Sequence, residues 1–259
     1  MTTSLSPRTL GIDAAPSAPG PIPFSRLVRV EWAKATDTRA ARCLLALVAL
    51  STIGMMLVPV LAPTTFDQTY ASYLRVAAFG LTILLPVVAI LLFTGEWSQR
   101  GVFTTFTQEP RRIRVVNAKL AVSLLMGGGA AVFGGVVTAA GLGLASASGR
   151  ALEANLTAGA VTGYLLFVLI NVFAGVALGA LLQSSAIAIA ACFALPAAFA
   201  LLGAASKLVA DWIDWSTTFN WVLENDWGGH VPQISFSVLF WVAVPLAVGV
   251  VRTMRRDVT

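Results

Sequence analysis

Residues 95–119 read GEWSQRGVFTTFTQEPRRIRVVNAK and form the longest strongly polar interruption between the early and the later apolar runs of this chain. Several of the apolar runs on either side reach the roughly 18 residues that a bilayer-spanning helix needs. Backbone groups in hydrocarbon must bond within their own segment, so these runs predict helices. A closed barrel would instead alternate polar and apolar residues, which these runs do not do. The pattern predicts an all-α membrane protein.

Composition supports the same class. Hydrophobic residues make up 57% of the chain and charged residues 11%, against about 45–50% and about 25% in soluble domains. The net charge of +5 is the excess of Lys and Arg that helical membrane proteins carry on their cytoplasmic side, so we expect no nucleic acid partner. Cys43, Cys192 and the single His230 show no metal-ligand spacing, and we expect no metal or cofactor in this chain.

Six spans are predicted, with polar segments before, between and after them. Residues 1–23, rich in Pro, Ser, Ala and Gly, predict a disordered tail. Residues 24–42 are basic and amphipathic, which is typical of an interfacial "elbow" helix, and residues 252–259 form a basic tail. The second span contains Pro86, and the fifth is expected to kink or break at Pro196. The predicted spans are residues 43–61, 73–93, 120–145, 158–182, 186–205 and 234–251.

The distribution of Lys and Arg predicts the orientation. If both termini are cytoplasmic, all but three of the 17 Lys and Arg residues lie on the inner side; the exceptions are Arg75, Arg150 and Lys207. Residues 95–119 then face the cytoplasm. Residues 206–232, in which tryptophans alternate with acidic residues, are expected to form short external helices at the interface. We expect a multi-pass protein of the cytoplasmic membrane, in a bacterium.

Few polar side chains interrupt the helical segments. Glu31 falls on the apolar side of the predicted elbow helix, where it pairs either with Lys34 or with a basic residue of the 95–119 stretch. Asn171 is the clearest polar residue within a span, and we consider both helix packing and a substrate path for it and for Pro196.

Two pairs of glycines in the fourth span are spaced as GxxxG: Gly159 with Gly163, and Gly175 with Gly179. Such small residues let membrane helices approach one another closely. They predict close packing within the chain, with a dimer face as the alternative.

Enzyme signatures are absent from the sequence. It contains no HExxH, no GxSxG and no Cys/His cluster. It also lacks the GxxxxGK[ST] phosphate loop, so it cannot bind ATP by that route. If the chain takes part in active transport, the energy must come from another polypeptide, and a polar cytoplasmic loop is where that polypeptide would dock.

The 95–119 stretch resembles the corresponding loop of the ABC-2-type permeases, the six-helix membrane subunits of ABC exporters. Members of that family carry a Glu soon after the second span, a Gly and a Thr-rich stretch, and a Pro-Arg pair before a span with an early Lys. The elbow, with Glu31 and Lys34, and the external segment at 206–232 are similar as well, so the resemblance covers nearly the whole chain after residue 23. The matching loop residues are Glu96, Gly101, Thr104, Thr105, Pro110, Arg111, Arg112 and Lys119.

The resemblance implies a permease that works as two copies, identical or not, with two ATP-binding cassette subunits that bind ATP and Mg²⁺. It also implies that the loop forms a cytoplasmic coupling helix between the second and third spans. Apolar side chains within this polar loop suit a cleft on a partner. The residues expected to couple are Glu96, Arg100, Gly101, Phe103, Thr104, Thr105, Phe106, Glu109, Pro110, Arg111 and Arg112.

The scarcity of charge in the spans favours a hydrophobic or amphipathic substrate such as a lipid, a drug or a peptide, although the residues do not identify it. Two other functions stay open. An ion-coupled secondary carrier would need charged sites in mid-membrane and an internal repeat. A membrane-embedded lipid-modifying enzyme would need clustered acid–base groups, and the candidate group is Asp211, Asp214, Glu224, Asp226 and His230.

Overall fold

The structure, a computed structural model, describes residues 22–98 and 111–255. Helices dominate these two ranges, and an isolated bridge between Thr69 and Glu153 is the one strand-like pairing that they contain. The helices are α1 (Phe24–Thr36), α2 (Arg39–Leu61), α3 (Tyr70–Thr82), α4 (Leu85–Ser98), α6 (Arg112–Ala147), α7 (Ala158–Leu182), α8 (Ser185–Ala205), α9 (Lys207–Trp212), α10 (Trp215–Leu223), α11 (Val231–Val238) and α12 (Val244–Arg255), with a π-helical turn, η1 (Leu239–Ala243), between the last two.

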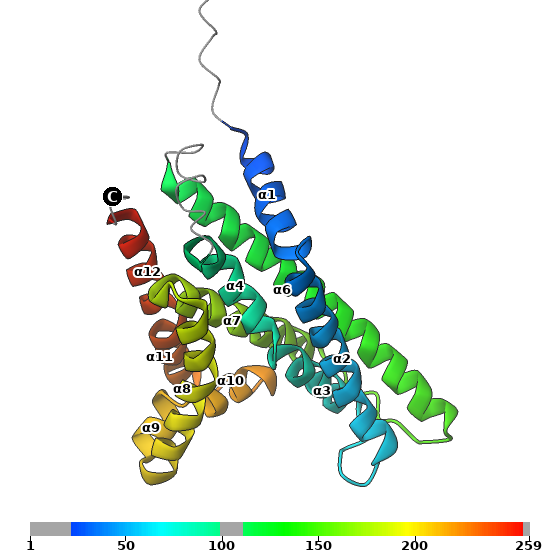
Figure 1. The fold of residues 1–259 in the computed structure, drawn as a ribbon. Helices are drawn as coiled ribbons and strands as arrows, with labels where there is room; N and C mark the ends of the chain where they lie inside the picture. The colour runs from blue at the N-terminus through cyan, green and yellow to red at the C-terminus, as the bar shows by residue number, and fades with distance from the viewer. Residues whose placement is uncertain (1–21, 99–110, 256–259) are drawn as a thin grey trace, which may run out of the picture.

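Six of the helical segments in the described ranges are long and apolar enough to cross a membrane: α2, α3 with α4, α6, α7, α8, and α11 with α12. This confirms the predicted all-α class with six spans, and it indicates a multi-pass membrane protein. The segments run up and down, so their ends gather in two places (Figure 1). We call the end with the start of α1, the start of α6 and the end of α12 the terminal end. The distal end is the opposite one, with residues 62–69 and α9.

Helix α7 lies at the centre of the bundle and packs against α3, α4, α6, α8, α10 and α12. Its glycines make the close contacts possible. A Cβ atom at Gly175 would collide with the carbonyl oxygen of Pro86, and one at Gly179 would lie 3.1 Å from that of Ile90. This GxxxG pair is therefore filled by α4 of the same chain.

The other glycine pair of α7 faces α10. A Cβ atom at Gly163 would collide with the carbonyl oxygen of Val222, and one at Gly159 with the side chain of Asn225. Both pairs thus serve packing within the chain, the first of the two alternatives that the sequence left open.

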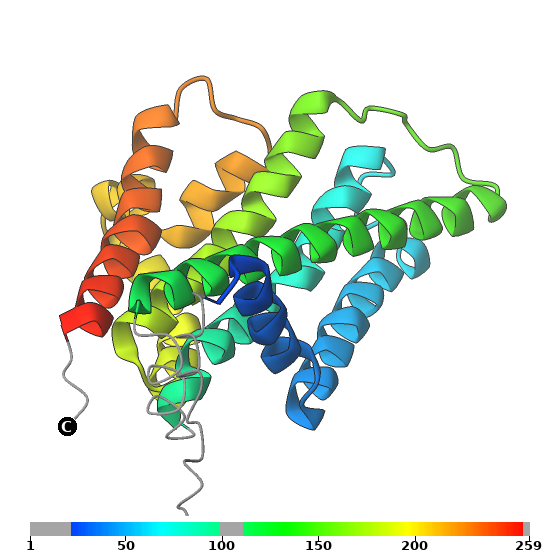
Figure 2. The ribbon, with the colours of Figure 1, turned by 90° about the horizontal axis from the view of Figure 1, so that it is seen from above.

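Helix α6 runs the length of the bundle. Its 36 residues begin at Arg112, well before the predicted start of the third span at residue 120. Near its start α6 bonds to α12 through Arg112 and Thr253, and farther along it packs on α2, where Gly141 meets Met56. Figure 2 shows this path, with α12 to one side of α6 and α2 to the other.

The region predicted as one helix over residues 24–42 is divided between two helices. α1 ends at Thr36, and a new helix starts at Arg39. The hydroxyl of Thr38 accepts a hydrogen bond from the N–H of Ala41 at 3.1 Å, which is the preferred way to satisfy a free donor in the first turn of a helix. Residues 39–42 therefore belong to α2, the first helix long and apolar enough to span a membrane.

Pro86 and Pro196, the two prolines that the sequence analysis singled out, behave differently. Pro86 separates α3 from α4, because its ring has no N–H and crowds the carbonyl of Thr82. Helix α8, by contrast, continues through Pro196 without a break. Proline lacks the N–H that would bond to the carbonyl four residues earlier, here that of Cys192, so α8 loses this hydrogen bond without ending.

The fourth span occupies the predicted residues 158–182 as α7, and the last span extends beyond its prediction, from Val231 to Arg255. Between the fifth and last spans lie the two short helices α9 and α10. At the distal end, Arg150 donates to the carbonyls of Pro59 at 3.2 Å and Val60 at 2.5 Å. A cation is favoured at a helix C-terminus, so Arg150 holds residues 148–157 against the end of α2.

Candidate functional site

Most of the predicted coupling residues lie outside the described part of the chain. These are Arg100, Gly101, Phe103, Thr104, Thr105, Phe106, Glu109 and Pro110, and the side chain of Glu96 is not described either. The structure does describe Arg111, Arg112 and both flanking helices, α4 and α6. The candidate site is therefore built from the described groups at the terminal end, on the helices that precede and follow this segment in the sequence.

A buried carboxylate lies at the centre of this region. The side chain of Glu31, on α1, is only 4% exposed, and its two oxygens accept from different lysines. Lys119 of α6 donates to Oε2 at 2.7 Å, and Lys34 of α1 donates to Oε1 at 2.6 Å. The local pair and the pair with the 95–119 stretch, which the sequence offered as alternatives, occur together.

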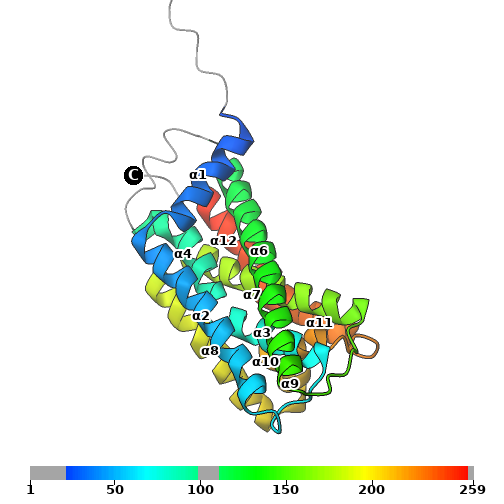
Figure 3. The same cartoon turned by 90° about the vertical axis from the view of Figure 1, so that its right-hand side faces the viewer.

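Lys119 connects three helices. Its side chain is 5% exposed, and its Nζ also donates to the carbonyl oxygen of Leu92 on α4 at 2.9 Å. The ring of Phe93 lies beneath the ammonium, 6.0 Å from its centroid. A buried ammonium is tolerated only when it is paired and hydrogen-bonded. The partners on α1 and α4 satisfy this condition, and in Figure 3 α1 lies across the neighbouring ends of α4 and α6.

Two arginines of the first turn of α6 reach the ends of the described chain. Arg112 donates to the carbonyl of Thr253 at 3.1 Å, and Arg114 donates to the carbonyl of Ile22 at 2.5 Å. Cations are unfavourable at a helix N-terminus. In this structure Arg112 acts at the C-terminus of α12, where a cation is favoured, so contacts within the chain offset part of the cost.

Polar residues of the turn between α7 and α8 complete the terminal end. Gln183 has a left-handed backbone (φ 53°), and its side chain donates to the hydroxyl of Thr253 at 3.1 Å. The hydroxyls of Thr94 on α4 and Ser185 on α8 lie 2.7 Å apart. In the sequence, residues 183–185 fall between the fourth and fifth predicted spans, and Thr94 directly follows the second. Their polarity at helix ends was the signal that they contact one another.

Asn171 belongs to helix packing. It is 5% exposed, its Nδ2 donates to the carbonyl of Phe167 at 2.8 Å, and its Oδ1 accepts from the indole N–H of Trp215 at 3.2 Å. The second bond joins α7 to α10. Pro196, on the exposed helix α8, makes no part of this contact, and the structure does not bring either residue into the terminal cluster.

The acidic residues considered for a lipid-modifying enzyme do not form one constellation. Asp214 caps α10 by accepting from Ser216 N at 3.0 Å, whereas Glu224 faces Arg75 on α3. His230 stacks on Trp221 with ring centroids 3.9 Å apart. Across residues 22–98 and 111–255, no three His, Cys, Asp or Glu side chains are grouped so that they could hold a metal ion.

We compared the chain with protein-family models, with curated proteins and with solved structures. None of the three comparisons found a match. The likeness to ABC-2-type permeases therefore stays a prediction from the residues quoted above. What the geometry adds is a connected junction of α1, α4 and α6, located where the chain enters and leaves residues 99–110.

Proposed function

We propose that this chain is the membrane-spanning permease subunit of an ATP-driven ABC exporter, in the cytoplasmic membrane, with its terminal end in the cytoplasm. The observation that supports the proposal best is the buried pair of Glu31 and Lys119. It joins α1 to α6, and Lys119 also bonds to α4. Helices α4 and α6 flank the segment that resembles a coupling helix. A force applied to that segment would therefore reach α4 and α6, and through the buried pair also α1.

In this proposal a separate ATP-binding cassette subunit docks on residues 99–110 and supplies the ATP and Mg²⁺ site that this chain lacks. Two permease copies, identical or not, form the transport path between them. When the ATP-binding subunits close, they displace the adjoining ends of α4 and α6. Packed helices respond to such a displacement by shifting as rigid elements, and the Glu31–Lys119 contact carries α1 along with them.

The substrate is proposed to be hydrophobic or amphipathic. Of the described helices, α2, α8 and the α11–α12 segment leave most of their apolar surface uncovered by the rest of the chain. These surfaces are available to lipid and to a second copy. A path between two such surfaces would present mainly apolar side chains to the substrate.

Isolation of the chain from native membranes tests the proposal. We expect an ATP-binding cassette subunit to co-purify and its ATPase activity to depend on this chain. Phe106→Asp should abolish the association, since it places a charge on an apolar anchor. Phe66→Asp, the same change in the distal loop, is the matched control and should leave the complex intact. Isolation without an ATPase, or an intact Phe106→Asp complex, would contradict the proposal.

A further inference from the structure

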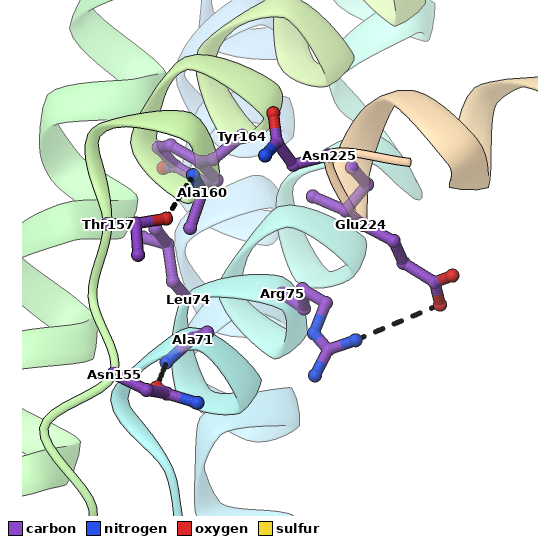
Figure 4. Close-up of a pocket in the computed structure, with 10 residues that line it drawn as sticks. Ala71, Leu74, Arg75, Asn155, Thr157, Ala160, Tyr164, Glu224 and Asn225 are labelled. Atoms are coloured by element: carbon purple, nitrogen blue, oxygen red, sulfur yellow. Dashed lines mark hydrogen bonds and ion pairs between the residues drawn. The ribbon is translucent and has the colours of Figure 1, made fainter. Parts of the chain in front are cut away.

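A cleft of about 180 Å³ opens at the distal end, between α3, α7, the end of α10 and the loop before α7. Its polar lining comes from Arg75, Asn155, Thr157, Glu224 and Asn225 (Figure 4). These residues come from three separate parts of the chain: α3, the loop before α7, and the residues just after α10. From the sequence we expected only that Arg75 lies on the outer side of the membrane, so the cleft itself is a product of the tertiary fold.

The two charged residues of the cleft are only loosely paired. Arg75 Nη1 lies 3.8 Å from Glu224 Oε1, and the side chains are 35% and 52% exposed. This separation is longer than a hydrogen bond. Among the described residues, neither the guanidinium nor the carboxylate makes a hydrogen bond to another group of the protein. The cleft therefore presents a cation with open donors beside an anion with open acceptors.

Two amide side chains add to this polar surface. Asn155 accepts from the backbone N–H of Ala71 at 3.0 Å through Oδ1, which fixes the amide and leaves its NH₂ group without a partner in the described chain. Asn225 has a left-handed backbone (φ 59°) and lies against Gly159, where a Cβ atom would collide with its amide. The backbone thus fixes the amide of Asn155, and the lack of a side chain at Gly159 leaves room for the amide of Asn225 at the edge of the cleft.

The remaining lining is apolar. Leu74 and Leu223 contribute side chains, and the hydroxyl of Tyr164 donates to the carbonyl of Ala131 at 2.7 Å, so it has no proton left for a ligand. Pockets for drug-sized ligands measure roughly 300–1,000 Å³. A cleft of about 180 Å³ therefore suits a smaller group with two opposite charges and a short hydrocarbon link.

We propose that this cleft binds a small zwitterion. Its phosphate or carboxylate oxygens bond to the guanidinium of Arg75, and its ammonium group bonds to the carboxylate of Glu224. A surface ion pair by itself is worth only about 0–1 kcal/mol. It does not explain why two amide side chains also lie at the edge of the cleft. The chemistry fits both an ethanolamine phospholipid headgroup in the distal leaflet and a free amino acid. The inference does not depend on the proposed transport function.

The experiment uses the full chain in nanodiscs and two kinds of probe. Glycine and O-phosphoethanolamine are titrated by calorimetry into phosphatidylcholine nanodiscs. In parallel, nanodiscs of mixed phosphatidylethanolamine and phosphatidylcholine are analysed by native mass spectrometry for retained lipid. We expect at least one probe to bind, and Arg75→Gln and Glu224→Gln each to weaken it by about tenfold or more, which is the loss expected for a hydrogen bond to a charged group.

Matched controls are available at the same end. Lys207→Gln and Asp211→Asn remove the same charges from α9, outside the cleft, and should leave binding unchanged. Binding of a soluble probe would identify a free zwitterion as the ligand, and selective retention of phosphatidylethanolamine alone would identify the lipid. Arg75→Lys, which keeps the charge, should retain part of the affinity. Failure of the wild-type chain to bind any probe, or equal binding by both cleft variants and the controls, would overturn the proposal.

Discussion

Replacing Lys119 by Met tests the buried junction most directly. The substitution keeps an unbranched side chain that is one atom shorter and removes the ammonium that bonds to Glu31 and to the Leu92 carbonyl. Because both charged side chains are at most 5% exposed, the cost belongs to the range for breaking a buried pair, about 3–5 kcal/mol. Glu31 keeps its bond to Lys34, so we expect the lower end, about 3 kcal/mol.

A contrast within the same cluster separates burial from simple charge loss. Lys34 bonds to the same carboxylate, but its side chain is 40% exposed. Lys34→Met should therefore cost no more than about 1 kcal/mol. The double variant Glu31→Met with Lys119→Met should regain most of the stability lost in Lys119→Met, because it leaves no unpaired charge in the interior.

The free energy of unfolding can be measured by titrating a denaturing detergent into micelles of each variant. The seven tryptophans provide the fluorescence signal. The reasoning fails if Lys119→Met loses no more stability than Lys34→Met. It also fails if the double variant is less stable than Lys119→Met, since the two changes would then act as separate losses and not as one broken pair.

Three further predictions concern other parts of the fold. Gly175→Ala should lower the free energy of unfolding by about 2 kcal/mol or more by overpacking, because the added Cβ meets the backbone of α4. Gly128→Ala, whose Cβ would have nothing within 4 Å, should be nearly neutral in the same unfolding titrations. Asn171→Leu should lower the free energy of unfolding by about 1–3 kcal/mol, because it leaves the buried indole N–H of Trp215 without an acceptor. An unchanged midpoint in the unfolding titration would contradict this role of Asn171. Gly228→Cys, in a background without native cysteines, should react with an impermeant reagent added outside the cell; labelling only from the cytoplasm would reverse the orientation.

The spans were predictable because a bilayer acts on each segment separately. Residues 158–182 form one helix as expected, since an uninterrupted apolar run must satisfy its own backbone wherever it lies. Boundaries were less predictable where a single side chain decides them. Thr38 separates α1 from α2 by capping α2, and arginines in the first turn of α6, which starts at Arg112, contact Thr253 and Ile22 near the two ends of the described chain.

The sequence identified residues of the candidate site but could not tell which of them bond to one another. The sequence identified Glu31 as an unusual acid on an apolar face and offered two partners for it. Only the packing of α1 on α6 allows one carboxylate to bond to both Lys34 and Lys119. Asn171 shows the same limit, because Trp215, its partner, lies in a different helix.

The sequence by itself determined the class of this protein, the number of its spans and the polar stretch at 95–119. These properties follow from local hydrophobicity and from the need of each segment to satisfy its own backbone. The tertiary structure alone decided which charges meet: Glu31 with Lys119 at the terminal end, and Arg75 with Glu224 in the distal cleft. Residues so far apart along the chain are brought together by helix packing, and at the distal cleft Gly159 of α7 lets Asn225 pack closely against it.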